Sequence, residues 1–484
     1  MKSNNQLILF IVGALLLVES IFMLFPGFVA LYFGERDCFF HFFSAMVTAL
    51  VGGVLTFSFR EHSKQLSKRD SYIIVLSVWL TFAVFGTLPF IFGGHLPSVV
   101  DAFFESMSGI TTTGATVMGE LELATHGILL WRSLLQWLGG MGIITFSLIL
   151  LPTMGIGGMQ MFSAEASVTR SDKMHPKVTA MAKYIWAIYI ILTLLEVIML
   201  RIGDMPWFDA VCHSLSTLST GGFSTHTASL EFYNSAYIEY VVMFFMFVGG
   251  INFTLMYVAI LGKFKRFAAD EELKFYFFVV VIATAIVSIS LINSDLNYGI
   301  ETSIRHAAFQ VIAVITSSGY TTADYVTWPP VFTAIMALLM LTGTCTGSTS
   351  GGIKLMRLLI MFRNIGIEVK RALHPTAVVP VKYNGKSLST NDLSSVLGFV
   401  LFYIVILVVG VILISMFGYN LEDSYGLAAN SLGNIGISIG QFGPTGDIPS
   451  ILPPVKIIMT ILMLIGRLEI FTVIIIFTRQ FWTR

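Results

Sequence analysis

The sequence predicts an all-α, polytopic membrane protein, and its composition is the first reason. Of the 484 residues, 55% are apolar and only 12% are charged, and the mean hydropathy is +0.82. A soluble domain carries about 25% charged residues, so lipid must be the solvent for much of this surface. The second reason is a series of long apolar runs, and the third is a set of four short segments that lie between them.

Crossing a hydrocarbon core of about 30 Å takes about 20 apolar residues, and ten runs meet that length. The first run is too long for the apolar core of a signal peptide, and no small-residue cleavage site follows it, so we expect it to remain in the mature protein. The ten expected transmembrane helices lie at residues 8–31, 39–59, 72–94, 127–151, 180–202, 236–262, 275–293, 329–362, 394–418 and 451–478.

The distribution of charge predicts the orientation. With the N-terminus inside, most of the 28 Lys and Arg residues fall on inward loops, as the positive-inside rule requires, and both termini are cytoplasmic. We expect the outer face to be acidic and to concentrate cations. The basic residues away from the inward loops are Arg36, Arg132, Arg201, Arg305, Lys456 and, within a span, Arg467. The acidic residues expected on the outer face include Asp37, Asp101, Glu105, Asp209, Glu239 and Asp423.

Composition and motifs exclude several other classes of function. Lys+Arg and Asp+Glu are balanced at 28 each, which leaves no basic surplus for binding nucleic acid. The three cysteines, Cys38, Cys212 and Cys345, are too scattered for a disulfide framework. No HExxH, GxSxG or Cys/His cluster points to an enzyme or a structural metal, and we expect no bound cofactor.

Four segments between alternate spans share one pattern. Each begins with a polar or charged residue thirteen positions before a glycine, is too short to cross the membrane as a helix, and ends in Gly, Thr and Ser. This pattern is typical of a re-entrant helix followed by a loop. The four segments are 101–114, 209–222, 306–319 and 423–436.

Non-helical backbone at membrane depth persists only if it is buried in protein or faces a water-filled cavity. We therefore expect the four Thr/Ser/Gly ends to converge on one axis, where carbonyl oxygens would replace the hydration shell of a monovalent cation. The C-terminal ends of the preceding helices would add negative partial charge there. The alternative is that these clusters are ordinary small-residue contacts between packed helices.

At these residues the chain resembles the TrkH/KtrB superfamily of potassium transporters, with SGITTTGATV, STLSTGGFSTH, VITSSGYTT and GNIGISIG at the four positions. The resemblance runs from about residue 72 to the end, and the two additional spans within 8–59 are similar to those of the TrkH subfamily. It implies four M1-P-M2 potassium-channel-like repeats in a pseudo-fourfold arrangement around one pore. The implied units are 1–70 for the two N-terminal helices and 71–179, 180–274, 275–391 and 392–484 for the repeats.

The resemblance further implies uptake of potassium, and of rubidium, through a channel-like pore with a four-repeat selectivity filter. The alternative is a proton- or sodium-coupled potassium symporter, for which Glu19, Glu196 and Glu469 are candidate carboxylates. The residues expected to bind potassium in the filter are Thr111, Thr112, Thr113, Gly114, Ser219, Thr220, Gly221, Gly222, Thr316, Ser317, Ser318, Gly319, Gly433, Asn434, Ile435 and Gly436.

Small residues interrupt the second span of each repeat, and the interruption at 343–352 is the longest. We interpret its sequence, GTCTGSTSGG, as an intramembrane loop that blocks permeation below the filter until the helix rearranges; ordinary helix packing is the alternative. A phosphate-binding loop is excluded because an isoleucine separates Gly352 from Lys354. The expected gate comprises Gly343, Thr344, Cys345, Thr346, Gly347, Ser348, Thr349, Ser350, Gly351, Gly352 and Arg467.

Arg467 lies deep in the last expected span, where a guanidinium is tolerated only if it faces a cavity or a partner. We expect it to project into the pore inside the filter, to add an electrostatic barrier to cations and to hydrogen-bond the 343–352 loop. The alternatives are that it pairs with Glu469, or with Glu196 or Glu19 on other spans.

The remaining expectations also follow from the resemblance. It implies a multi-pass protein of the bacterial cytoplasmic (inner) membrane that forms a homodimer and works with a cytosolic nucleotide-binding regulatory subunit of the TrkA type. The basic loops at 263–267 and 369–375 are candidate contacts for that subunit, although such loops more often only fix the topology.

Overall fold

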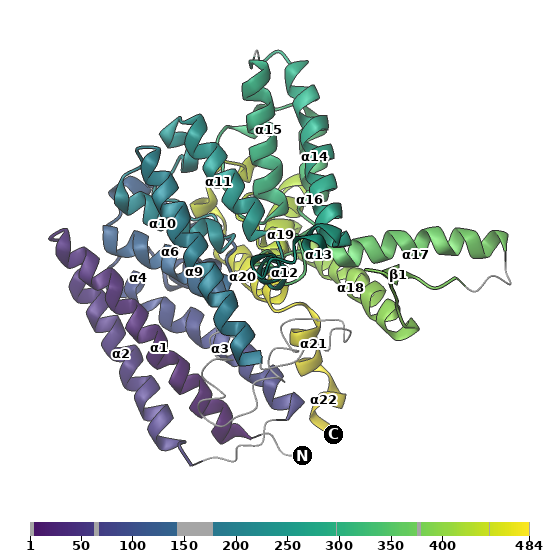
Figure 1. Ribbon diagram of the computed structural model, residues 1–484. Helices are drawn as coiled ribbons and strands as arrows, with labels where there is room; N and C mark the ends of the chain where they lie inside the picture. The colour runs from purple at the N-terminus through teal and green to yellow at the C-terminus, as the bar shows by residue number, and fades with distance from the viewer. Residues whose placement is uncertain are drawn as a thin grey trace.

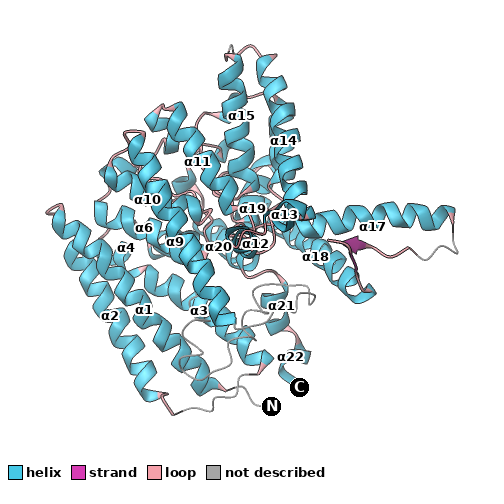
Figure 2. Cartoon of the chain, viewed as in Figure 1, coloured by secondary structure: helices cyan, strands magenta, loops and turns pink. Residues whose placement is uncertain are grey.

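The computed structural model describes residues 4–61, 67–142, 178–296, 298–374, 379–444 and 446–483. Within these ranges the chain is helical except for one two-stranded hairpin and the loops (Figure 2). The predicted all-α class is therefore confirmed. The second half of the expected span 127–151, and the loop that follows it to residue 177, lie outside the described residues.

Among the described residues, six helical segments are long and apolar enough to cross a membrane. Large apolar side chains such as Phe57, Phe277 and Val408 are exposed on them, which suits a surface covered by lipid. The chain is thus a multi-pass membrane protein. The helices that form these segments are α1 (Asn5–Tyr32), α2 (Cys38–Ser58), α3 (Lys68–Gly86) with α4 (Leu88–Phe92), α9 (Val178–Ile202), α14 (Glu271–Ile292) and α18 (Thr390–Ser415).

Two further spans are broken in the middle, at the small residues that the sequence analysis singled out. α11 (Ala236–Gly249) and α12 (Phe253–Ile260) meet at 98°, and α20 (Pro453–Arg467) and α21 (Phe471–Phe477) meet at 110°. The other two expected spans begin in α6 (His126–Gly140) and α16 (Pro330–Leu339), and α16 continues through irregular backbone into α17 (Leu355–Leu373). All ten expected spans thus begin or lie in helix, and three of them, 236–262, 329–362 and 451–478, are interrupted within the described residues.

Four short helices carry the segments that were expected to be re-entrant: α5 (Val99–Ile110), α10 (Trp207–Leu218), α15 (Ile300–Ile315) and α19 (Leu421–Gly433). Each is packed between spans. α10 packs on α6, α15 on α11 and α5 on α20, so the last helix pair returns to the first short helix. Between the third and fourth units, the Tyr425 hydroxyl of α19 donates to the Ala337 carbonyl of α16, which closes the four units into a ring.

The far part of α17 and the remaining described elements lie at the ends of the spans. α17 and the hairpin of β1 (Lys382–Tyr383) and β2 (Lys386–Ser387) project from the body as an arm (green in Figure 1). The other short elements are α13 (Phe264–Ala269), α22 (Arg479–Thr483) and the 3₁₀ turns Leu121–Leu123, Ser229–Tyr233, Tyr325–Thr327, Gly440–Phe442 and Ile448–Ser450.

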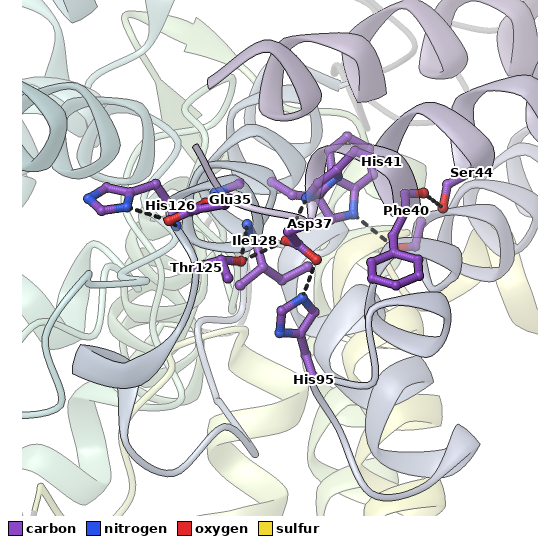
Figure 3. Close-up of polar contacts among 12 residues, drawn as sticks. Glu35, Asp37, Phe40, His41, Ser44, His95, Thr125, His126 and Ile128 are labelled. Carbon is purple, nitrogen blue, oxygen red and sulfur yellow. Dashed lines mark hydrogen bonds and ion pairs between the residues drawn. The ribbon is translucent and has the colours of Figure 1, made fainter. Parts of the chain in front are cut away.

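The turn between α1 and α2 joins the N-terminal helices to the rest of the chain (Figure 3). Asp37 lies 2.8 Å from His95 Nε2 and 3.3 Å from His41 Nε2, and it accepts a 2.6 Å hydrogen bond from the Thr125 hydroxyl. Glu35 lies 2.7 Å from His126 Nδ1 and also accepts the backbone N–H of His126. These buried and half-buried contacts fix α1 and α2 against the start of α6.

The expectation of a freely acidic outer face is wrong for several of its carboxylates, because they are buried and paired. Asp101, 8% exposed, lies 2.7 Å from Lys456 Nζ, and Glu105, 0% exposed, lies 2.8 Å from Arg132 Nε. Glu239 is paired with Arg305 at 2.6 Å. A buried carboxylate needs an opposite charge as partner, so these residues form ion pairs inside the protein and do not add to the negative potential of the outer face.

Replacing Asp37 by Asn should destabilise the protein by about 1–3 kcal/mol, because the amide loses the charge that holds the two histidines. Burial raises the pKa of Asp37, but the hydrogen bonds from His41, His95 and Thr125 outweigh it and hold the pKa well below its usual range. The contribution is therefore present above about pH 4 and is lost as the pH falls through the folded-state pKa.

The measurement is the thermal unfolding midpoint of the detergent-solubilised protein at pH 7 and at acidic pH. Asp204→Asn is the control, since Asp204 is exposed on the same side. Equal midpoints for Asp37→Asn and wild type at pH 7 would contradict the stabilising role of this cluster.

Candidate functional site

The four short helices end in four turns with the same backbone. In each turn the residue two positions before the glycine has a left-handed φ although it is not glycine, and the glycine has a positive φ too. A left-handed conformation costs a non-glycine residue about 1–2 kcal/mol, so its recurrence at four matching positions indicates a common requirement. The φ values are 52° for Thr112, 54° for Thr220, 53° for Ser317 and 52° for Asn434, and 84° for Gly114, 79° for Gly222, 69° for Gly319 and 96° for Gly436.

The four glycines form a closed ring of backbone contacts. A Cβ atom placed on any one of them would lie less than 3.0 Å from a backbone carbonyl oxygen of the next turn, a separation that real Cβ atoms essentially never show. The pairs run in chain order and return to the start: Gly114 with Gly221 O, Gly222 with Ser318 O, Gly319 with Ile435 O and Gly436 with Thr113 O. The structure therefore brings all four expected filter segments together, and only glycine fits at these positions.

The polar side chains of these turns are buried, and most of their hydrogen bonds are to groups of the same turn or of the helix that precedes it. The Thr111 and Thr316 hydroxyls each donate a 2.6 Å hydrogen bond to a carbonyl one turn back in their own helix. Each also lies within 2.9 Å of the hydroxyl two residues on, that of Thr113 or Ser318. The hydroxyls thus brace the helix ends, and the first and third turns share the same arrangement.

The fourth turn is held by amide side chains. Asn434 Nδ2 donates to the Thr113 hydroxyl at 3.0 Å and to the Met463 carbonyl at 2.9 Å. The backbone N–H of Gly436 donates to Asn430 Oδ1 at 2.7 Å. The Asn434 amide therefore joins the fourth turn to the first turn and to α20. In the first turn, threonine hydroxyls rather than amides brace the end of the helix.

The sequence analysis missed Gln136, which braces the second turn from α6. Its Nε2 donates to the Gly221 carbonyl at 2.7 Å, and its Oε1 accepts the Phe223 N–H at 3.0 Å. A lone amide in the apolar run LLQWLGG was the available signal, because such a group needs partners inside the membrane.

Arg132 was expected on the outer side as an ordinary basic residue, but it is 1% exposed and lies behind the same turns. Besides Glu105, its guanidinium donates to the Ser224 carbonyl and to the Thr116 hydroxyl, both at 3.0 Å. Glu105 in turn accepts the Val117 N–H at 2.8 Å. This network ties together the segments that follow Gly114 and Gly222.

The 343–352 segment is an irregular loop closed at its base and inserted against the turns. Gly343 N donates to Ile353 O at 2.8 Å across the base. At the tip, the Thr349 hydroxyl donates to the carbonyls of Leu218 and Gly249 at 3.2 and 3.3 Å. The Gly351 N–H donates to the Ser317 hydroxyl at 2.8 Å. The loop therefore touches both the end of α10 and the third turn.

Arg467 ends α20 beside this loop. Its guanidinium donates to the Thr349 carbonyl at 2.7 Å and to the carbonyls of Gly139 and Gly140 at 2.6 and 3.2 Å. The expected hydrogen bond to the loop is present. Glu469, one of the alternative partners, accepts a 2.6 Å hydrogen bond from Arg357 Nη2.

The other two alternative partners of Arg467 are not engaged with it. Both carboxylate oxygens of Glu19 and of Glu196 are buried without a hydrogen-bond partner among the described residues. Lys354, which follows the loop, is also buried and donates to the Ser350 carbonyl.

Residues 37–483 match the family model TrkH, described as cation transport protein. The chain belongs to the TrkH family. It is 35% identical to the Trk system potassium uptake proteins TrkH of Salmonella typhimurium and of Halomonas elongata, over 98% and 99% of both chains respectively. Its fold matches the crystal structure of the potassium transporter TrkH from Vibrio parahaemolyticus with a TM-score of 0.90 and 33% identity over the full length of both chains. These TrkH-family relatives are transporters and not enzymes.

In this TrkH-family chain, Gly114→Ala should distort the ring, because the residue has a φ of 84° and the new methyl would meet the Gly221 carbonyl. We expect a loss of monovalent cation flux and a destabilisation of about 1–2 kcal/mol or more. The control is Gly119→Ala, since nothing lies within 4 Å of a Cβ atom there. Flux into liposomes and the thermal midpoint are the measurements, and equal behaviour of the two variants would contradict the close contact.

Proposed function

We propose that this protein takes up potassium, and rubidium, through a channel-like pore whose selectivity filter is the ring of four turns. The single observation that carries the proposal is the cyclic contact of the four glycines with the carbonyls of the neighbouring turns. Backbone oxygens brought together in one closed ring of turns suit a dehydrated monovalent cation. The names of the relatives, potassium uptake proteins, supply the ion.

The proposed filter residues are 111–114, 219–222, 316–319 and 433–436. The C-terminal ends of α5, α10, α15 and α19 lead directly into them, and the negative end of each helix dipole favours a cation. No cofactor enters this scheme. Entry of each ion is driven by the membrane potential, worth about 2.3 kcal/mol per charge per 100 mV.

The proposed gate is the 343–352 loop together with Arg467. The contacts of Thr349 with Leu218 and Gly249, and of Gly351 with Ser317, support a closed position directly against the filter turns. The positive charge of Arg467 on the Thr349 carbonyl both anchors the loop and opposes a cation at the same level.

The proposal also covers the membrane, the orientation, the oligomeric state and the partner of the protein. It places the protein in the bacterial inner membrane with both termini in the cytoplasm, as a homodimer regulated by a cytosolic nucleotide-binding subunit of the TrkA type. It keeps the division into 1–70 and the repeats 71–179, 180–274, 275–391 and 392–484. The support is the positive-inside distribution of Lys and Arg and membership of the family.

The second candidate is proton- or sodium-coupled potassium symport. It is favoured by Glu19 and Glu196, two carboxylates that are 0% exposed. They belong to α1 and α9, outside the four turns, and no matching carboxylate recurs in the other units. Glu469, the third candidate, is engaged with Arg357. A passive pore therefore remains the first proposal.

Rubidium uptake into liposomes that contain the purified protein alone should proceed without a proton or sodium gradient. We expect potassium to compete strongly and sodium and N-methylglucamine to compete weakly. Uptake that appears only with an imposed proton or sodium gradient would favour the symporter, and equal competition by sodium would contradict a potassium-selective filter.

Arg467→Ala should raise the basal rubidium uptake by about tenfold, because it removes charged hydrogen bonds of about 1.5–3 kcal/mol that hold the loop. Arg467→Lys, which keeps the charge, should lie between the variant and wild type. The control is Arg201→Ala at the outer end of α9. Unchanged uptake in a well-folded Arg467→Ala protein would contradict the proposed barrier.

A further inference from the structure

Glu272, the second residue of α14, is a buried carboxylate in a region that the sequence analysis left unassigned. It is 4% exposed. Its Oε1 accepts the backbone N–H and the hydroxyl of Thr346 at 2.8 and 3.1 Å and the backbone N–H of Met356 at 3.0 Å. Its Oε2 accepts the Tyr383 hydroxyl at 3.4 Å. One carboxylate thus receives donors from three segments.

Two of these segments are the limbs of the 343–352 loop. Thr346 lies on the limb that enters the tip, and Met356 lies in the first turn of α17, on the limb that leaves it. The Met356 N–H is among the amides at the N-terminus of α17 that have no partner within the helix, and such amides attract a negative charge. Glu272 therefore joins both limbs, and the loop cannot widen while these bonds hold.

The third segment is the hairpin of β1 and β2, on the proposed cytoplasmic side. Asn384 at its tip donates its backbone N–H to Glu271 and its side-chain amide to Asp270, each at 2.9 Å. Arg363 Nη1 lies 2.6 Å from Glu271 and donates to the Lys382 carbonyl at 2.7 Å. The start of α14 is thus fixed to an exposed hairpin that stands on the projecting arm (Figure 1).

We propose that Glu272 is a positioning residue that latches the intramembrane loop shut and connects it with the hairpin at 382–387. The inference rests on the proposed function of the loop as a gate. Arg467 and Ser317 hold the tip of the loop from the filter side, and Glu272 holds its two limbs from the opposite side. A cytosolic event that moves the hairpin would withdraw the carboxylate and free the limbs.

The chain contains its own reporter for this latch. Cys345 lies in the loop next to Thr346 and is 1% exposed, so a closed loop should protect its thiol. The experiment treats the full-length protein in detergent with a small cationic methanethiosulfonate and measures the labelling of Cys345 by tandem mass spectrometry. Glu272→Ala should raise the labelling rate at least about tenfold, because two loop amides and a hydroxyl lose a charged acceptor.

Two other variants and a control make the result specific. Glu272→Gln keeps one acceptor oxygen and should give an intermediate rate. Asn384→Ala, which removes the side-chain hydrogen bonds of Asn384 with the Asp270 carboxylate and with the Glu271 backbone N–H, should raise the rate to a smaller extent. Asp295→Asn, beyond the other end of α14, should leave it unchanged. A wild-type rate for Glu272→Ala would overturn the latch, and a wild-type rate for Asn384→Ala would overturn the link to the hairpin.

Rubidium uptake by the same variants separates this inference from the proposed function. If wild type and Arg467→Ala carry rubidium but Glu272→Ala changes neither uptake nor labelling, the pore stands and the latch is wrong. If Glu272→Ala exposes Cys345 but no variant carries rubidium, the latch stands as a structural contact and the proposed transport is wrong. A folding defect would appear as increased labelling of the buried Cys38 and Cys212 as well.

Discussion

The structure depends on the direct contact of four backbone turns at their glycines. No side chain fits between Gly114, Gly222, Gly319, Gly436 and the carbonyls that they face, so the helices around them must deliver each turn to a fixed place. Two glycines of the second spans approach the ends of the short helices just as closely. A Cβ atom on Gly139 would collide with the Ile110 carbonyl at the end of α5, and one on Gly466 would collide with the Leu432 carbonyl near the end of α19. The glycines near the ends of α6 and α20 therefore follow from the ring, because a helix with a side chain at either position could not approach the end of a short helix so closely.

The ring is fourfold in its backbone but not in the side chains that support it. Gln136 braces the second turn, the Thr316–Ser318 pair supports the third, and Asn434 joins the fourth turn to the first. Each solution satisfies polar groups inside the protein, where an unmet hydrogen bond costs more than it does in water. The first and third turns share a hydroxyl pair, and the second and fourth use amides, a mixture of devices that a symmetric assembly of identical subunits cannot have.

Sequence reasoning predicted the spans, the four re-entrant segments and the position of the long loop, because these depend on apolar length and on glycine spacing. It could not predict the partners of buried charges, since these lie far apart along the chain. Asp101 and Lys456 form an ion pair although most of the sequence lies between them. Arg132 could not be told from an exposed basic residue by its sequence neighbours. Glu272 was hidden for the same reason: nothing near it in the sequence shows that Thr346 and Met356 come to it.

The place of Arg467 follows from the same chemistry as the proposed filter. The carbonyls of Gly139 and Gly140, at the end of α6, and of Thr349, in the irregular 343–352 segment, all accept hydrogen bonds from Arg467. Such oxygens attract any cation, and the guanidinium of Arg467 is a cation that cannot diffuse away. The protein thus satisfies these carbonyls with a tethered charge, whereas in the proposed filter a mobile ion would bind the backbone oxygens of the ring. In the proposed gate, a loop held by that tethered charge would open only when the arginine finds other acceptors or when the loop is released on its far side, where Glu272 holds it.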